Sequence, residues 1–278
     1  MDLVGIDADS LVKMLKVSFS LENWNAIIEI SDKLFEVTAI IHEISENNPS
    51  QHSLERDIAY YFGYSFLMKG IAFQRIRKYN EARECINRYA NLDWIKNVSE
   101  EGCVEVDYYR NISVANMYVI DLLEGKIEVL FNYVELLRNM SKDEIVPGMI
   151  TVLESAITYG YSVDWVISEF KDQIRAIGTT DTKEDIRFYV DYIFLLAVYY
   201  HKQKRYTDTI TLVLDILEIS SRLEDEVGFR KAAALYEVLR EYATTDQREV
   251  YRSLMEKILE RLWKNEKGFI NDNRIIVN

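Results

Sequence analysis

Apolar residues recur along most of the chain at spacings of three and four positions, which is the period of one face of an α-helix. Between Leu21 and Leu34, for instance, Trp24, Ile27 and Ile28 fall on the same side of a helix. The pattern predicts about twelve helices with short connections. We expect them at residues 9–18, 21–44, 54–77, 80–92, 104–123, 126–139, 141–159 and 183–202, with others beginning near residues 162, 206, 225 and 246.

Residues that start or stop helices lie between several of these segments. Ser141 and Glu144 have the spacing of a capping box, in which the serine accepts from a free backbone amide and the glutamate reaches back. Gly160 can adopt the left-handed conformation that ends a helix, and Glu124-Gly125 marks a turn. These positions predict where helices begin and end more sharply than the apolar spacing does.

Two prolines and ten glycines are very few for 278 residues. Helix interiors exclude both residue types, whereas sheets joined by tight turns need many of them. The composition therefore predicts an all-α protein, with Pro49 and Pro147 in connections or first helical turns.

Two polar segments, at residues 47–51 and 178–182, are expected to separate helices. No linker rich in Gly, Ser or Pro divides the chain, and no low-complexity run appears. We therefore expect one continuous helical domain over residues 1–266, followed by a polar C-terminal tail over residues 267–278.

Pairs of small residues predict helices that pack closely. Gly70 and Ala82 stand on either side of a short polar turn, and Ala197 and Thr209 repeat the arrangement later in the chain. Small side chains let two helix axes approach, and the aromatic residue one turn after each pair's first member fills the space toward the next hairpin. A chain built of such hairpins is a scaffold for holding another molecule.

This arrangement resembles the tetratricopeptide repeat, over about residues 62–92 and less closely over about residues 191–218. Two positions depart from the repeat, because Lys69 replaces its leucine and Trp94 stands where its closing proline would be. The resemblance implies a right-handed α-solenoid of about six antiparallel helix hairpins, with the first helix of each hairpin lining a concave face.

The stretch from Phe19 to Leu34 looks like the entry into the ligand-sensing domain of Gram-positive peptide-pheromone regulators. That resemblance implies a role in bacterial transcriptional or quorum-sensing-type regulation. In those regulators a helix-turn-helix DNA-binding domain commonly comes first, and nothing resembling one precedes the first expected helix here. Either the DNA-reading part is absent or this member acts without it, so we expect no direct nucleic acid binding by this chain.

The resemblance also points to peptide-binding residues. In tetratricopeptide domains that hold peptides, an asparagine two positions before a packing residue often bonds the peptide backbone. With the turn at Gly125 and Tyr118 as the packing residue, Asn116 takes that place, and its amide offers both a donor and an acceptor. Aromatic and polar residues on first helices complete the candidate site, namely Tyr64, Gln74, Arg75, Tyr109, Asp191, Phe194 and His201.

Each candidate also has a purely structural interpretation. Asn116 can be a buried asparagine satisfied by a neighbouring helix, or a surface one, and the apolar candidates can fill space between hairpins. Cys85 and Cys103 belong to no Cys-x-x-Cys, and none of the three histidines has a second histidine or a cysteine at ligand spacing. We therefore expect no catalytic residue, no metal and no cofactor.

Charge and hydropathy restrict the partners. The net charge is −13 with Lys and Arg scattered, and such a surface repels nucleic acid and anionic lipid. The acidic balance favours solubility or a basic partner. No segment approaches the ~20 apolar residues that cross a bilayer. The first residues lack the basic start of a signal peptide, so we expect a cytoplasmic protein that does not bind membranes.

Together these patterns predict a non-enzymatic protein that binds a short peptide or a partner protein on its concave face. A ligand that binds a closed form better than an open one would change the surface offered to a partner. One alternative is a protein–protein adaptor or antagonist with no small ligand. Another is an enzyme, which would need a cluster of perturbed titratable groups. A homodimer through the terminal repeats is a further expectation.

Overall fold

The computed structural model describes residues 3–47, 54–177, 183–223 and 225–272. Within these ranges every regular element is a helix, which confirms the predicted all-α class for the described part of the chain. The elements in chain order are α1 (Ala8–Ser20), α2 (Trp24–Asn47), α3 (Ile58–Arg75), α4 (Tyr79–Ala90), α5 (Glu100–Leu123), η1 (Ile127–Val129), α6 (Leu130–Leu137), α7 (Lys142–Tyr159), α8 (Asp164–Ile177), α9 (Lys183–Lys202), α10 (Tyr206–Leu223), α11 (Glu226–Leu239), η2 (Arg240–Tyr242) and α12 (Thr245–Asp272).

The predicted helix boundaries at Ser141 and Gly160 are confirmed. The Glu144 carboxylate accepts the backbone N–H of Ser141 at 3.1 Å, and the capping box is complete. Gly160 ends α7 with φ +78°, a left-handed conformation that glycine adopts without steric cost. Gly125, in the turn after α5, also has a positive φ of +89°. Local sequence chemistry thus sets these turns.

Proline and the sixth helix differ from the sequence prediction. Pro147 lies in the second turn of α7, not in a connection or first turn. It removes only one backbone hydrogen bond near the helix start, and burial of the apolar residues around it, including Met149 and Leu153, holds the helix together. The helix expected over residues 126–139 begins as the 3₁₀ turn η1 before continuing as α6.

Some predicted segments fall wholly or partly outside the described residues. These include Pro49, most of the expected break at residues 47–51, and the whole expected break at residues 178–182. The helix α12 continues to Asp272, through the first residues of the expected C-terminal tail. Residues 273–278 of that tail lie outside the described part of the chain.

The chain groups into two compact units, residues 1–136 and 137–278, and each is described by itself. The single domain over residues 1–266, the right-handed solenoid and the number of hairpins stay predictions.

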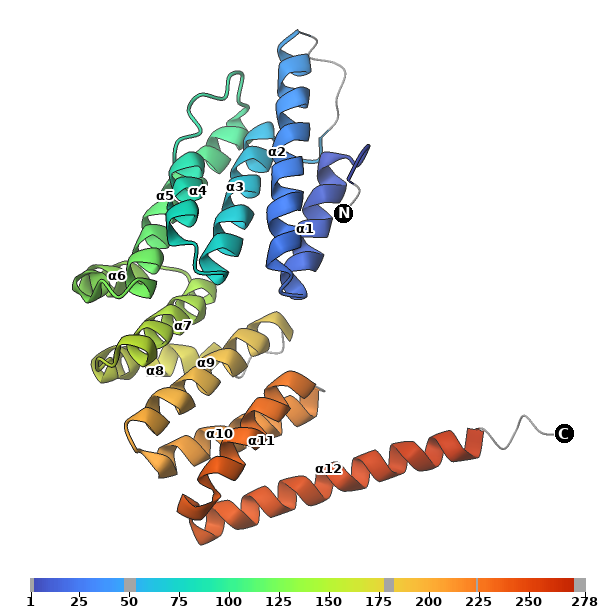
Figure 1. Ribbon diagram of the computed structural model, residues 1–278, viewed down its shortest axis with the longest axis vertical. Helices are drawn as coiled ribbons and strands as arrows, with labels where there is room; N and C mark the ends of the chain where they lie inside the picture. Colours follow the sequence, from blue (N-terminus) through green and yellow to red (C-terminus); the bar gives the residue numbers. More distant parts are fainter. Residues whose placement is uncertain (1–2, 48–53, 178–182, 224, 273–278) are drawn as a thin grey trace, which may run out of the picture. The chain divides into compact units, whose positions relative to one another are not determined.

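In the first unit, α1 to α5 lie side by side, and α3 contacts α2, α4 and α5 (Figure 1). One apolar core fills the space between α1, α2 and α3, where Leu15, Ile27, Ile30 and Leu34 are fully buried. A second core joins α3, α4 and α5. Burying one such side chain contributes about 1.5–3 kcal/mol, so these cores explain why successive amphipathic helices stack.

The predicted close approach at Gly70 and Ala82 is confirmed. Both residues are buried, and a Cβ atom at Gly70 would lie 3.1 Å from the Cβ of Cys85 on α4. A second close approach joins α3 to α5, because a Cβ at Gly63 would overlap the ring of Tyr109. Glycine at these two positions lets α3 contact both of its neighbours.

A polar cluster fastens α4 to the end of α5. The Arg83 guanidinium donates to the Asp121 carboxylate at 2.7 Å and to the Glu124 carboxylate. Lys126 donates to Asp121 at 2.8 Å from beyond the turn. The Arg83 side chain is 21% exposed, so its charge is largely removed from water and depends on these carboxylates.

In the second unit, α9 packs against α7 and α10, and α10 packs against α11 and α12. Ala197 on α9 and Thr209 on α10 are fully buried, as the repeated small-residue pattern predicts. The Thr209 hydroxyl donates to the carbonyl oxygen of Arg205, just before α10, at 2.9 Å, so this buried polar group is satisfied locally.

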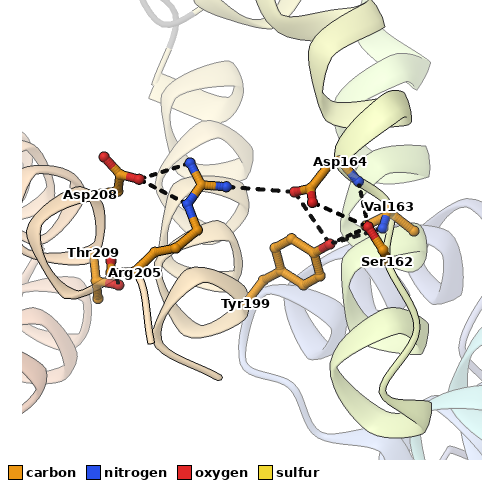
Figure 2. A network of polar contacts seen from close by, with 7 residues as sticks. All are labelled: Ser162, Val163, Asp164, Tyr199, Arg205, Asp208 and Thr209. Atoms are coloured by element: carbon orange, nitrogen blue, oxygen red, sulfur yellow. Dashed lines mark hydrogen bonds and ion pairs between the residues drawn. The ribbon is translucent and has the colours of Figure 1, made fainter. Parts of the chain in front are cut away.

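A polar network ties the turn between α9 and α10 to the start of α8 (Figure 2). The Arg205 guanidinium contacts Asp208 at 2.8 Å and Asp164 at 3.6 Å. The Tyr199 hydroxyl accepts the backbone N–H of Val163 at 2.9 Å. The network therefore holds two neighbouring turns of the second unit together.

Candidate functional site

A cleft lies in the second unit beside the first half of α12. Helix α12 follows the turn that leads out of α11 and η2 (Figure 1). Its volume is about 380 Å³, within the range of sites that bind small ligands. Helix α11 and η2 supply two of the lining residues and α12 supplies the rest. The lining consists of Tyr236, Arg240, Arg248, Tyr251, Arg252, Met255, Glu256 and Leu259.

Two stacked tyrosine rings line this cleft. Tyr236 on α11 is buried, and its ring centroid lies 3.7 Å from that of Tyr251 on α12. The Tyr251 hydroxyl donates to Glu237 at 2.9 Å. Burial, followed by this hydrogen bond to a carboxylate, raises the pKa of Tyr251 to about 12. The hydroxyl therefore stays protonated at neutral pH and orients Glu237.

Three arginines also line the cleft, and each has N–H donors beyond those used in its contacts with nearby glutamate residues. Arg240 approaches the second oxygen of Glu237 at 3.4 Å, and Arg252 contacts Glu256 at 2.9 Å. Arg248 donates to the backbone carbonyl of Glu241 at 3.2 Å. A guanidinium carries five N–H donors, so each of these contacts leaves most of them available.

The residues of α12 that line the cleft belong to a longer row of side chains along the helix. Arg248, Arg252, Met255, Leu259 and Leu262 follow one another at spacings of three and four, which places them on one side of the helix. Leu259 is 65% exposed and Leu262 is 55% exposed. We call these five residues the α12 stripe. It is basic in its first turns and apolar in the later ones.

The opposite side of α12 faces α10 across a second, wider cavity of about 690 Å³. Polar contacts hold the two helices together here. Gln247 donates to Thr207 and Thr211 at 3.0 Å, and Arg261 donates to the carbonyl oxygen of Ser221 at 2.8 Å. Helix α12 is therefore attached to α10 partly through polar contacts, while Leu259 and Leu262 on its other side stay more than half exposed.

The sequence-predicted residues of the first unit lie mostly inside the helix packing. The Asn116 side chain on α5 donates to the Tyr89 hydroxyl at 2.8 Å, which matches the structural alternative considered for it. Tyr109 is buried, and its hydroxyl donates to the carbonyl oxygen of Tyr60 at 3.1 Å. Tyr64 is half-buried and stacks on Tyr60 with ring centroids 5.3 Å apart.

Gln74 and Arg75 lie at the other end of α3, about 15 Å along the helix from Tyr64. Arg75 is exposed, and its guanidinium lies 5.9 Å from the ring centroid of Trp24 on α2. The structure thus brings Tyr64 and Tyr109 together between α3 and α5, and leaves Gln74 and Arg75 apart from them.

The remaining predicted residues lie on α9 in the second unit. Asp191 and Phe194 are half-buried, and the Lys231 ammonium lies 5.6 Å from the Phe194 ring centroid. The His201 ring is 5.9 Å from that of Tyr206, and its Nδ1 atom is buried with no hydrogen-bond partner in the described residues. These residues lie on a different helix from those that line the cleft.

Sequence reasoning missed the cleft residues. The arginines at 248 and 252 are four positions apart and precede apolar residues at the same spacing, so the stripe was visible in the sequence. The stripe becomes part of a cleft only because Tyr236 of α11 and Arg240 of η2 lie beside it. The angle between two consecutive helices decides this, and the sequence pattern does not contain it.

The described residues hold neither a cluster of metal ligands nor a membrane-spanning helix. No group of three or more His, Cys, Asp or Glu side chains there could hold a metal ion. No helix of the described part is long and apolar enough to cross a membrane.

Comparison with known proteins gives no relative for this chain. No protein-family model matches it, and neither the curated proteins nor the solved structures contain a match.

Proposed function

We propose that this chain is a non-enzymatic binding protein that holds a short peptide or a segment of a partner protein. The observation that carries the proposal is the α12 stripe, where Leu259 and Leu262 are more than half exposed on a helix that contributes one wall of a cleft. Interfaces between proteins are enriched in Arg, Tyr and Met, and all three line this cleft.

The stripe suits a segment that lies along the helix. Residues 248 and 262 are separated by about 21 Å of helix, long enough for several residues of an extended peptide. Apolar side chains of such a segment would cover Met255, Leu259 and Leu262. Burying each large apolar side chain contributes about 1.5–3 kcal/mol before the entropic cost of association is subtracted, so micromolar binding needs several such contacts.

The wider role rests on the resemblance of residues 19–34 and 62–92 to tetratricopeptide-type regulators. On that basis we propose a bacterial regulator in which the bound segment changes the surface offered to another protein. In this regulator proposal, the candidate residues of the first unit also contact a peptide, and Asn116 is the main one of them.

The second candidate function is an adaptor that binds a folded protein and no small ligand. Two exposed sides of α12 favour it, because the cavity toward α10 is larger than the cleft beside α11, and Val250 next to it is 50% exposed. A partner that covers both sides would bury more of α12 than a short peptide does.

Selection from a random peptide library on the immobilised chain, followed by calorimetry, tests the proposal. Selected peptides should bind the wild type and bind Leu262→Ser roughly tenfold more weakly. Val238→Ser is the matched control, because Val238 is 68% exposed on α11 and does not line the cleft. Recovery of no binding peptide, or equal affinity for Leu262→Ser and wild type, would overturn the proposal.

A further inference from the structure

The three cleft arginines form a positive site in an acidic chain. The net charge of the whole protein is −13, yet three arginines and one glutamate line this cavity. They come from two elements, because Arg240 lies in η2 and the other two lie on α12. Arginines gathered around one cavity attract an anionic group, since the guanidinium fork matches the oxygens of a carboxylate or phosphate.

The carboxylates of Glu237 and Glu256 do not neutralise all three arginines of this site. Glu237 is held by the Tyr251 hydroxyl through one oxygen and by Arg240 through the other. Glu256 contacts the Nε atom of Arg252 at 2.9 Å. The Arg240 and Arg252 side chains are 64% and 81% exposed, so their remaining N–H groups face water or an incoming ligand.

The neighbouring apolar residues distinguish a peptide from a free anion. Arg248 and Arg252 occupy the first turns of the α12 stripe, and Met255, Leu259 and Leu262 occupy the next. A ligand that satisfies both parts carries negative charge at one end and apolar side chains at the other. The stacked ring of Tyr251 adds a flat contact surface between the two parts.

We propose that the cleft binds an acidic peptide segment whose carboxylates contact Arg240, Arg248 and Arg252 and whose following apolar side chains cover Met255 and Leu259. This inference rests on the proposed function and adds the chemistry of the ligand. Charge complementarity supports it, and the negative charge of the rest of the chain favours a peptide over nucleic acid, whose long phosphate backbone the surface repels.

The probe is a pair of synthetic peptides, one with Asp and Glu preceding Leu and Tyr, and one with Asn and Gln in the acidic positions. Calorimetry should show at least roughly tenfold tighter binding of the acidic peptide by the wild type, weakening as salt rises. The double variant Arg248→Gln/Arg252→Gln should lose this preference. Arg230→Gln, which removes an exposed charge from α11 outside the cleft, should retain it.

Several outcomes would overturn the inference. Equal binding of the two peptides, both weakened by Leu262→Ser, would leave the proposed function standing and refute the acidic ligand. Binding of neither peptide would refute both. Displacement of the acidic peptide by inorganic phosphate or by a short single-stranded DNA, at concentrations at which chloride has no effect, would assign the arginines to another anion. A dimer in sedimentation equilibrium that dissociates in the double variant would assign the cleft to a second copy of the chain.

Discussion

Tyr236 of α11 and Tyr251 of α12 stack nearly parallel, with ring centroids 3.7 Å apart and an interplanar angle of 8°. This contact attaches the last helix to the one before it along an otherwise open cleft. Tyr236 is buried, whereas Leu259 and Leu262 of α12 are more than half exposed, so the stack is one of the packed contacts that hold the helix.

Replacing Tyr251 should therefore release α12. Tyr251→Ala is expected to cost about 2 kcal/mol, from lost burial and lost stacking, and to speed hydrogen exchange of the backbone amides of α12. Tyr251→Phe keeps the ring and loses only the hydroxyl contact with Glu237, so its exchange should stay close to wild type. Unchanged exchange in Tyr251→Ala would show that other contacts hold the helix.

Removing Arg83 should weaken the first unit. Arg83→Met keeps the length of the side chain but leaves Asp121 and Glu124 partly buried with fewer donors. We expect a loss of about 1–2 kcal/mol in the free energy of unfolding, measured by urea denaturation. The control is Arg110→Met, whose partners Asp93 and Asp107 are 73% and 68% exposed, and whose loss should stay below about 1 kcal/mol.

The same cluster predicts a pH dependence. Burial alone would raise the pKa of Asp121 and of Glu124, but hydrogen bonds from Arg83 and Lys126 outweigh it and lower both values. The resulting stability is present above the ordinary pKa values of 3.8 and 4.5 and is lost as pH falls through the lowered ones. The urea midpoint should fall less between neutral pH and roughly pH 3 in Arg83→Met than in the wild type. Parallel curves would contradict this.

Gly63 is expected to tolerate no side chain. Gly63→Ala would force the buried Tyr109 ring to move and should cost about 1–3 kcal/mol. In a Tyr109→Ala background the same substitution should cost little, because the ring that it meets is gone. Additive losses in the double variant, measured by chemical denaturation, would mean that the two positions do not interact.

Asn116 has a structural partner as well as a proposed ligand. Removing its amide should cost about 1 kcal/mol, because the Tyr89 hydroxyl loses the donor at 2.8 Å. A double-mutant cycle of Asn116→Ala with Tyr89→Phe should give a coupling energy of at least about 0.5 kcal/mol. If selected peptides bind Asn116→Ala and wild type equally in calorimetry, Asn116 does not anchor the ligand.

The helices were readable from the sequence because burial of one face imposes its period on the residues. Ser141 and Gly160 set the ends of α7 by local chemistry, which the sequence also contains. Pro147 was placed wrongly, since a proline near a helix start sacrifices a single hydrogen bond that packing can offset. Helix periodicity and capping residues therefore predicted the positions of the helices. They did not predict that packing would keep Pro147 inside α7.

The candidate site was harder to predict because it depends on which neighbour each side chain meets. Tyr108 and Tyr109 are adjacent in the sequence, yet Tyr108 is 50% exposed and Tyr109 is buried against Gly63. The partner of Asn116 is Tyr89 on α4, a helix that carries none of the candidate residues. Side-chain type identified residues suited to binding, whereas only packing distinguishes those that remain accessible.

The fluorescence of Trp263 is sensitive to what lies beside the α12 stripe. The indole is 58% exposed on α12, one position beyond the last residue of the stripe. Indole emission moves to shorter wavelength when water around the ring is replaced by protein. Because Trp24, Trp94 and Trp165 also emit, the difference in emission between the wild type and Trp263→Phe reports occupation of the apolar end of the stripe without a label.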